Sequence, residues 1–586
     1  MHVLATAGHV DHGKSTLVRA LTGMEPDRFA EEQRRGLTID LGFVWAGIDG
    51  EQVAFVDVPG HERFVPTMLA GVGPVPAALL VVAADEGWMP QTQEHVDALD
   101  AFGVRHGLLV VTRCDLADPA PARAAAHEHL AGTGLAHVGS VAVSARTGAG
   151  MDELRTAIGA LVRSLPRPDT SAPVRLWVDR SFTVRGAGTV VTGTLSAGTL
   201  RTGDRLDLPS GEQAVVRGLQ SLAAQHREVA AVARVAVNLR GTPRTAVQRG
   251  DALTAPGRFL ASSLIDVRCA ALDDHAPAQA LMHVGSAQVS VRLRHLGDDV
   301  WRLRLARALP LRLGDVGLLR DPGRHTVLSG LTVLDVDPPA VSRRGAAAAR
   351  AAELKTVSGQ PDGAAEVDRR GVVRRSHLLA MGVPLEQVQA LPGPDDWLVA
   401  PARADELARR LLQVIEAHNR ATPLDPGLPV DAARAALKVP ATAVVEAVVR
   451  PPLRVLRGRV VDSRRSGDEL PATVLRAVEQ VAARTSRVPL APPDADELRG
   501  LGLGSRELAA AVRSGRLLEV APGVVLAPDG LQAAAAALRA LDAPFTVAAA
   551  RDAWGTSRRV AVPLLELLDR RGVTRRLSDD RRTLAG

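Results

Sequence analysis

Residues 8–15, GHVDHGKS, have the composition and spacing of a phosphate-binding loop. Gly8 and Gly13 allow the backbone to curl until its N–H groups face phosphate oxygens. Lys14 can then reach the β and γ oxygens, and the Ser15 hydroxyl can ligate Mg²⁺. The run VLATA before the loop predicts a short strand, and STLVRALTG after it has helical spacing. In this context we expect the nucleotide to be bound by Gly8, His9, Val10, Asp11, His12, Gly13, Lys14, Ser15 and Thr16.

Two further segments follow in the order that a GTP-binding domain needs. In RGLTID, the hydroxyl of Thr38 could complete the Mg²⁺ shell when a γ-phosphate is present. In DVPGH, after the predicted strand QVAFV, Asp57 can serve the same metal and the Gly60 N–H can face the γ-phosphate. A lone threonine is more often a helix cap, and DVPG alone could be a turn. Their order and spacing favour two switch segments, with Ser15, Thr38 and Asp57 as the Mg²⁺ ligands.

The segment TRCD, residues 112–115, follows the apolar run GLLVV and could choose the base. Asp115 can accept hydrogen bonds from the guanine N1–H and exocyclic amine, which adenine cannot supply, while the stem of Arg113 lies against the base. The segment SAR, residues 144–146, follows another apolar run, and its Ala145 N–H could donate to the guanine carbonyl. The sequence therefore predicts GTP, with the base held by Thr112, Arg113, Asp115, Ser144, Ala145 and Arg146.

Together these motifs resemble those of translational GTPases. The usual base motif of that family is Asn-Lys-x-Asp, from which Thr112 and Arg113 depart. The resemblance implies that His61, directly after DVPG, orients the attacking water. It also implies that an apolar gate at Val10 and Leu37 holds this histidine back until a ribosome is bound. On its own, a histidine in a loop is more often a surface residue.

After the Pro-rich segment LPRPDTSAP, the sequence changes to short alternating runs such as GTVVTGTL and ARVAVNL between Gly-rich turns. This pattern predicts a small closed β-barrel at 172–258. GAGTVVTGTLSAGTL resembles the second domain of elongation factors. By the same resemblance, the strand-rich stretch 262–340 is their third domain and 1–168 their GTP-binding domain.

Within that family, VDRSFTVRGAGTVVTGT resembles the selenocysteine-specific elongation factors. The resemblance implies an amino-acid pocket at Asp179 and Arg180, with Arg234 as a further basic position. A selenol is more acidic than a thiol and is largely anionic at neutral pH, so a basic pocket would favour it over neutral serine. The alternative reading is that these are surface arginines paired with carboxylates such as Asp179.

About 245 residues follow these three domains, which is more than an ordinary tRNA-delivering factor needs. Helical stretches followed by a short two-stranded ribbon recur over about 60 residues. We therefore expect winged helices, each with its own small core, at 343–402, 403–468, 469–527 and 528–586. In the last one, Gly555 ends a helix, Thr556 can cap the next, and GVTRRL and RRTL form a hairpin.

The last winged helix is rich in arginine. Winged helices also serve as protein-interaction modules, so the fold alone leaves the partner open. The resemblance resolves this, because the last winged helix of the selenocysteine-specific factors binds a hairpin in messenger RNA. An Arg-rich helix start and wing suit RNA. The predicted RNA contacts are Arg558 and Arg559 on the helix and Arg575, Arg576, Arg581 and Arg582 on the wing.

Charge divides along the chain: residues 1–166 hold 12 Lys and Arg against 20 Asp and Glu, and the remainder holds 59 against 45. A polyanionic partner for the later domains and a solvated Arg-rich surface both fit this division. The longest apolar stretch, about residues 68–84, is too broken to span a bilayer, and no basic leader precedes it. With two distant cysteines as well, we expect a cytosolic protein, which we take to be a monomer.

The resemblance thus implies a multidomain chain with an α/β P-loop GTPase domain, two β-barrels and tandem winged helices. With GTP and Mg²⁺ it would carry selenocysteinyl-tRNA to a ribosome at UGA codons, tethered to a messenger-RNA hairpin. The alternatives are a general elongation or initiation GTPase, the GTPase subunit of a sulfate-activating enzyme, which shares the first three domains, and a DNA-binding regulator, which would use only the tail.

Overall fold

The computed structural model describes most of the 586 residues. They form two compact units, Met1–Glu366 with Arg374–Leu391, and Val367–Val373 with Pro392–Gly586. The predicted first winged helix, 343–402, contributes residues to both. No helix in the described part is both long and apolar enough to cross a bilayer. The described ranges are 1–26, 38–61, 64–73, 75–186, 188–269, 271–273, 275–324, 326–425, 427–464, 470–488 and 490–585.

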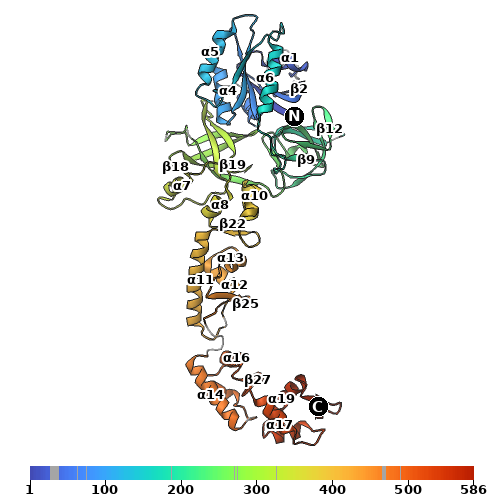
Figure 1. Ribbon diagram of the computed structural model, residues 1–586, viewed down its shortest axis with the longest axis vertical. Helices are drawn as coiled ribbons and strands as arrows, with labels where there is room; N and C mark the ends of the chain where they lie inside the picture. The colour runs from blue at the N-terminus through green and yellow to red at the C-terminus, as the bar shows by residue number, and fades with distance from the viewer. Residues whose placement is uncertain are drawn as a thin grey trace. The chain divides into compact units, whose positions relative to one another are not determined.

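A six-stranded sheet lies at the centre of the first domain, in the order β2-β3-β1-β4-β5-β6 (Figure 1). Strand β2 is antiparallel to β3, and the other neighbours are parallel. Parallel strands buried on both faces read as near-continuous apolar runs, as AALLVVA in β4 does. The strands are β1 (His2–Ala7), β2 (Gly42–Ile48), β3 (Glu51–Asp57), β4 (Ala77–Ala83), β5 (His106–Thr112) and β6 (Gly139–Ala142).

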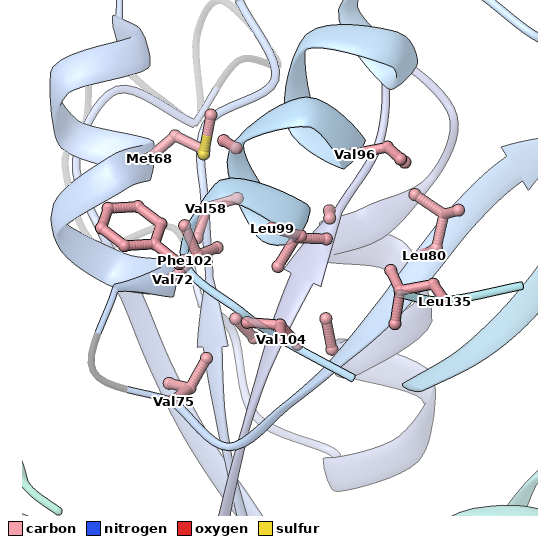
Figure 2. Close-up of a cluster of buried hydrophobic side chains, with 14 of the residues drawn as sticks. Val58, Met68, Val72, Val75, Leu80, Val96, Leu99, Phe102, Val104 and Leu135 are labelled. Carbon is pink, nitrogen blue, oxygen red and sulfur yellow. The ribbon is translucent and has the colours of Figure 1, made fainter. Parts of the chain in front are cut away.

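Helices cover both faces of this sheet. Figure 2 shows Met68 and Val72 of α3 and Val96 and Leu99 of α4 within the buried cluster on one face. Helices α1 and α6 bury a second apolar cluster on the opposite face. The helices are α1 (Lys14–Thr22), α3 (Val65–Val72), α4 (Pro90–Ala101), α5 (Pro119–Leu130) and α6 (Met151–Ser164). Because β1, β3, β5 and β6 run in parallel, the loops that follow them gather at one edge of the sheet.

Two antiparallel barrels follow. The first has the row β10-β15-β7-β8-β14-β11-β12, and pairing of β10 with β11 closes it; the second is the closed barrel β16-β19-β18-β17-β20-β21. Strands of the first region are β7 (Arg175–Val184), β8 (Gly188–Leu195), β9 (Thr199–Arg201), β10 (Arg205–Asp207), β11 (Gln213–Ser221), β12 (Ala224–His226), β13 (Glu228–Ala230), β14 (Ala233–Arg240) and β15 (Ala252–Thr254). Those of the second are β16 (Leu260–Arg268), β17 (Gln279–Val284), β18 (Ala287–Gly297), β19 (Val300–Leu311), β20 (Val316–Arg320) and β21 (Val327–Asp335).

Helix α7 (Ala346–Leu354) is fixed to the second barrel by a buried ion network. Arg350 pairs with Asp335 and, at 2.8 Å, with Asp266. Asp266 also pairs with Arg302 of β19 at 2.7 Å. Removing one partner from such a buried network leaves an uncompensated charge, which costs much more than the network contributes. The first residues after the barrels are therefore tied to them.

The tail alternates helices with small sheets of two or three strands, as expected. The helices are α8 (Gly363–Arg370), α9 (Arg375–Met381), α10 (Leu385–Ala390), α11 (Pro401–Ala421), α12 (Val430–Leu437), α13 (Thr442–Val448), α14 (Ala472–Arg487), α15 (Ala495–Gly500), α16 (Ser505–Arg513), α17 (Gly530–Leu538), α18 (Val547–Ala553) and α19 (Arg558–Arg570). The strands are β22 (Val372–Arg374), β23 (Trp397–Val399), β24 (Leu428–Pro429), β25 (Leu453–Leu456), β26 (Arg459–Asp462), β27 (Leu518–Ala521), β28 (Val524–Leu526), β29 (Thr574–Arg576) and β30 (Arg582–Leu584).

The last two winged helices share a ribbon, so the expectation that each has its own core is wrong for them. Val524 and Leu526 of β28 lie in one cluster with α17, α18 and α19, while Val525 lies in another with α14 and α16. Successive side chains of a strand point to opposite faces. Strand β28 therefore serves both cores. Leu490 also belongs to the core of the last winged helix.

The cap of α19 also differs from the prediction. Thr556 lies one residue too early: the N-cap is Ser557, whose side chain makes no capping hydrogen bond. The side-chain cap in this region belongs to α18, where the Thr546 hydroxyl accepts from the Ala549 N–H. The predicted hairpin is present as β29 paired with β30.

The shared ribbon predicts how the tail tolerates truncation. A fragment of residues 470–586 should unfold cooperatively, whereas a fragment of residues 530–586 should not. The shorter fragment loses Leu490, Val520, Val524 and Leu526 from its core. Each such burial contributes about 1.5–3 kcal/mol, so the sum approaches the whole stability of a small domain. Thermal unfolding followed by circular dichroism measures this, and equal melting of the two fragments would disprove the shared core.

Candidate nucleotide site and the neighbouring arginine pocket

The loop between β1 and α1 has the curled backbone that its sequence predicts. Asp11 and Gly13 adopt left-handed conformations, with φ of 62° and 84°. Gly8 has φ of 133°, and a Cβ there would overlap the carbonyl oxygen of Val81. The chain can therefore follow this path only with glycine at position 8. Thr16 lies exposed in the first turn of α1.

Helix α4 supports the loop through two side chains that the sequence did not single out. The N–H of Gly8 donates to Nδ1 of His95 at 3.0 Å, and the N–H of Val10 donates to Gln91 at 3.2 Å. Burial, with the charges of Lys14 and His9, lowers the pKa of His95 to about 3. His95 is therefore neutral, as an acceptor at Nδ1 must be.

Lys14 is buried beneath the loop. Its Nζ donates to the carbonyl oxygens of Gly8 at 3.0 Å and His9 at 2.7 Å. Burial lowers the pKa of this ammonium to about 8, although Asp57 and Asp11 favour its charged form. A phosphate would favour the same charged form, so the site is suited to an anion.

Three oxygen-bearing side chains converge beside Lys14, as predicted. The Ser15 hydroxyl lies 2.9 Å from the Thr38 hydroxyl and donates to Asp57 at 2.6 Å. Asp57 is fully buried and also accepts from the Thr6 hydroxyl at 2.7 Å. Mg²⁺ prefers hard oxygen ligands of this kind and usually keeps several waters. These side chains therefore fit a magnesium ion.

Gly60 and His61 follow β3 on the same edge of the sheet. A Cβ on Gly60 would lie 2.7 Å from the N atom of Val10, so the two loops can approach this closely only with glycine there. The His61 ring lies 6.0 Å from the Phe64 ring, and its carbonyl accepts from the Phe64 N–H. Leu37, the other predicted gate residue, lies outside the described residues.

The departure from the usual base motif at position 112 has a structural explanation. The buried Thr112 hydroxyl donates to the carbonyl of His12 at 2.8 Å and so ties the motif to the phosphate loop. Arg113, in a left-handed conformation, pairs with Asp85 at 3.0 Å and Glu86 at 2.8 Å and donates to the Asp11 carbonyl. These bonds hold the Arg113 guanidinium against the phosphate loop and the loop after β4.

Asp115 faces Arg146, the last residue of SAR, at 2.7 Å. Hydrogen bonds from Ser144 and then from Arg146 hold the pKa of Asp115 below its usual value. The carboxylate is thus ionised and able to accept from a base. Ser144 is buried and Ala145 half-buried beside it. The structure brings both base motifs together.

The residues predicted to form an amino-acid pocket, called the arginine pocket below, have their charges paired. Arg234 of β14 binds both carboxylate oxygens of Asp179 and lies 3.3 Å from the Thr194 hydroxyl. Thr192 donates to the same carboxylate at 2.7 Å. Asp179 and Arg234 side chains are only 4% and 11% exposed. Arg180 points to the GTPase domain instead, where it pairs with Asp40 at 2.8 Å.

The six predicted RNA-contacting arginines separate into two groups. Arg582 is buried and pairs with Asp569 at 2.9 Å, so its prediction as a surface RNA contact is wrong and its place is in the core of the hairpin. The other five are exposed. Arg576 pairs with Asp580 and Arg581 with Asp579 within the turn. Arg559 donates to the Pro493 carbonyl at 3.4 Å.

The remaining two arginines, Arg558 and Arg575, form no ion pair with any residue that the structure describes. The sequence pattern did not distinguish any of these arginines from the others.

Sequence reasoning also missed Asp40 and Phe43 beside the arginine pocket, because the residues that they contact belong to another domain. The only local signal was the position of Asp40, two residues after Thr38.

Three family models match the chain. The elongation factor Tu GTP-binding domain matches residues 1–164, elongation factor Tu domain 2 matches 188–254, and the winged helix of elongation factor SelB matches 536–583. The matched regions include the phosphate loop, Arg234 and most of the last winged helix, whereas Asp179 and Arg180 lie between the first two matches.

Curated relatives agree with these matches. The chain is 39% identical over 336 residues to a selenocysteine-specific elongation factor of Desulfomicrobium baculatum, an alignment that covers 54% of this chain and 53% of that protein. It is 36% identical to elongation factor Tu 2 of Streptomyces avermitilis, covering 45% of this chain and 75% of that one. The chain thus spans about half the length of the selenocysteine-specific relatives that it matches.

A crystal structure of a bacterial selenocysteine-specific elongation factor has the same fold along its whole length. It superimposes with a TM-score of 0.79 at 24% identity and covers 100% of both chains. The GTPase domain, both barrels and the winged helices are therefore arranged in the same order along both chains. The chain belongs to the elongation factor Tu family of translational GTPases. It is similar to a selenocysteine-specific elongation factor over 54% of its length and to the SelB winged helix over residues 536–583.

Proposed function

We propose that this protein is a GTP-dependent elongation factor that delivers selenocysteinyl-tRNA to the ribosome at UGA codons. In this proposal its last winged helix holds a hairpin of the messenger RNA, and the chain acts as a cytoplasmic monomer. The observation that carries the proposal is the pair of arginines, Arg180 and Arg234, beside the first GTPase switch. The matched SelB winged helix supports the tether.

GTP would bind with its phosphates in the loop of residues 8–15. Lys14, now bonded to two loop carbonyls, would turn its ammonium to the β and γ oxygens. Mg²⁺, when bound, would neutralise charge on these oxygens, and Ser15, Thr38 and Asp57 would hold it. Asp115 would accept hydrogen bonds from the guanine. The ion pair between Arg146 and the Asp115 carboxylate would have to open for this.

Hydrolysis would depend on His61. We assign it the task of orienting the water that attacks the γ-phosphorus as the bond to the β-phosphate breaks. Val10, which packs beside Gly60, would keep it away until the ribosome repositions the loop. His61 would contribute by orienting the water, because phosphoryl transfer requires little covalent chemistry from the protein.

The aminoacyl end of the tRNA would enter between the first barrel and the GTPase domain. There a selenolate could replace a carboxylate as partner of a guanidinium, which a serine hydroxyl cannot do. In the tail, Arg558 at the start of α19 and Arg575 in the ribbon are available for phosphates, with Arg559, Arg576 and Arg581 beside them.

The alternatives are less well supported. A general elongation factor or the GTPase subunit of a sulfate-activating enzyme would have no use for a SelB-type winged helix. A DNA-binding regulator would have no use for the switch segments.

Asp115→Asn should change the preferred base from guanine towards xanthine. The amide nitrogen of asparagine cannot accept a hydrogen bond from the guanine N1–H, but it can donate one to the xanthine carbonyl. GTP affinity should therefore fall sharply while XTP affinity rises. Equilibrium titration with both nucleotides measures this. Asp118→Asn is the matched control, since that carboxylate only caps α5. Equal loss for both nucleotides would remove Asp115 from base recognition.

Binding of selenocysteinyl-tRNA and seryl-tRNA, compared side by side, tests the proposed function. Arg180→Ala and Arg234→Ala should each weaken the first much more than the second. Losing the partner of a partly buried anion costs on the order of 1.5–3 kcal/mol, or about 10- to 150-fold in Kd. If the wild-type protein does not prefer selenocysteinyl-tRNA, the proposed function is wrong; equal losses for the two tRNAs would assign the arginines to the fold or the tRNA backbone.

Arg558→Ala and Arg575→Ala should each weaken binding of the RNA hairpin. For a phosphate contact, the slope of log K against log salt should flatten by roughly one unit per arginine removed. Arg539→Ala, an exposed position at the end of α17, serves as the control. Arg582→Ala should instead lower the melting temperature, because Asp569 loses its buried partner. Unchanged RNA binding in both surface variants would contradict the assigned surface.

A further inference from the structure

The guanidinium of Arg146 lies on the carboxylate that is expected to read the base. Its Nε and Nη2 both donate to Oδ2 of Asp115, at 3.1 Å and 2.7 Å. Arg146 forms no other ion pair with any residue in the described ranges. The Asp115 side chain is 15% exposed and that of Arg146 is 76% exposed, so the carboxylate is recessed and the guanidinium lies on its solvent side.

This pair of donors has the same chemistry as the edge of guanine that Asp115 would bind. Guanine presents its N1–H and its exocyclic amine from two nitrogens that are joined through C2. An arginine presents its Nε–H and Nη–H groups from two nitrogens that are joined through Cζ, in a fixed planar fork. Arg146 therefore offers Asp115 the same pair of N–H groups as the base, together with a positive charge.

Asp115 cannot accept hydrogen bonds from Arg146 and from guanine at the same time. A carboxylate has about four lone-pair sites, two on each oxygen. The two donors of Arg146 use both sites of Oδ2, and the Ser144 hydroxyl bonds to the same carboxylate. No more than about one site then remains, whereas the N–H groups of guanine need two. Arg146 therefore has to leave before the base can bind.

The other long or polar side chains of the base motif are engaged elsewhere. The Thr112 hydroxyl donates to a carbonyl of the phosphate loop, and the Arg113 guanidinium pairs with two carboxylates in the loop after β4. Neither donates to Asp115 in the part of the chain that the structure describes. Competition for this carboxylate is thus between Arg146 and the base.

Only the side chain of Arg146 has to move. Its loop is closed by the N–H of Ser144, which donates to the carbonyl of Ala149 at 2.9 Å. The base motif is joined to the strand before this loop, because the Cys114 N–H donates to the Val143 carbonyl at 3.3 Å. An exposed side chain changes rotamer within picoseconds to nanoseconds. Exchange between the bound and the withdrawn position is therefore fast compared with nucleotide binding.

We infer that Arg146 is an intramolecular competitor of guanine, which lowers the affinity of the nucleotide site by occupying Asp115. Only the fraction of molecules in which Arg146 is withdrawn can bind the base, and the apparent affinity is reduced by that fraction. GTP and GDP carry the same base, so both are weakened by the same factor. This inference rests on the proposed function, in which Asp115 reads guanine, and it makes Arg146 a competitor of the base where a base contact was expected.

Arg146→Ala tests the inference, because it removes the guanidinium and keeps the backbone of the loop. Binding of GDP and of a non-hydrolysable GTP analogue is measured by equilibrium titration and by stopped flow. Both should tighten by the same factor of roughly two to five, the range expected for an exposed pair of arginine and carboxylate. The association rate constant should rise by this factor while the dissociation rate constant stays unchanged, since the competitor acts on the free protein.

A second measurement separates competition at Asp115 from other effects of the substitution. Asp115→Asn removes the charge that holds the guanidinium and changes the preferred base to xanthine. Adding Arg146→Ala to Asp115→Asn should therefore leave the Kd for XDP unchanged. Tightening by the same factor in both backgrounds would show that Arg146 acts without Asp115, and this result would overturn the inference.

Arg105→Ala is the matched control. Arg105 is another exposed arginine of the GTPase domain that pairs with a carboxylate, Asp100, at 2.7 Å. It lies directly before β5, at the opposite end of that strand from the base motif. Its removal should leave the Kd for GDP and both rate constants unchanged. Melting temperatures of all variants are measured to confirm that each is folded.

Three results in Arg146→Ala would also overturn the inference. Unchanged affinity would mean that the ion pair does not obstruct the base. Weaker affinity with faster dissociation would make Arg146 a direct contact of the bound base, and a change confined to one nucleotide would assign it to the phosphates. A wild-type protein that binds XDP as tightly as GDP contradicts the base assignment of the proposed function itself, and this comparison is made before any variant is measured.

Discussion

The nucleotide site depends on the buried carboxylate of Asp57. It accepts hydrogen bonds from Thr6 in β1 and from Ser15 at the start of α1, and Thr6 in turn accepts from the N–H of Val58. A carboxylate taken fully out of water is tolerated only when its oxygens are satisfied or a cation is near. These bonds therefore hold two neighbouring strands, the phosphate loop and the second switch in one arrangement. Thr38 connects the first switch to this arrangement through its contact with Ser15.

The sequence predicted the parts of the site whose residues are close together in the chain. The phosphate loop and the base motif could be recognised because each lies directly after an apolar strand, and parallel strands deliver such loops to one edge. His95 could not be found in this way, because its bond to Gly8 crosses 87 residues and depends on how α4 packs. The same holds for Phe43, whose stacking on Arg234 belongs to the contact between two domains.

The arginines show a second limit of sequence reasoning. Arg582 looked like its neighbours on the wing, yet it is buried against Asp569, and Arg350 is buried between two aspartates. An arginine that is buried in an ion pair stabilises the fold and is not available to bind a polyanion. Net charge along the chain therefore overstates the surface available to RNA. Pairing distinguishes Arg558 and Arg575 from the rest, and pairing depends on tertiary structure.

The shared ribbon fixes how the last two winged helices are oriented to each other. Because Val524 and Leu526 face one core and Val525 faces the other, the third and fourth winged helices cannot rotate about each other without exposing apolar surface. Interfaces as apolar as a domain core fix orientation, whereas polar linkers leave it free. The contact between Arg559 and Pro493 crosses the same boundary. An RNA hairpin bound at α19 would thus be held by a rigid pair of domains, which restricts where a tethered factor can reach and so raises its effective concentration near the codon.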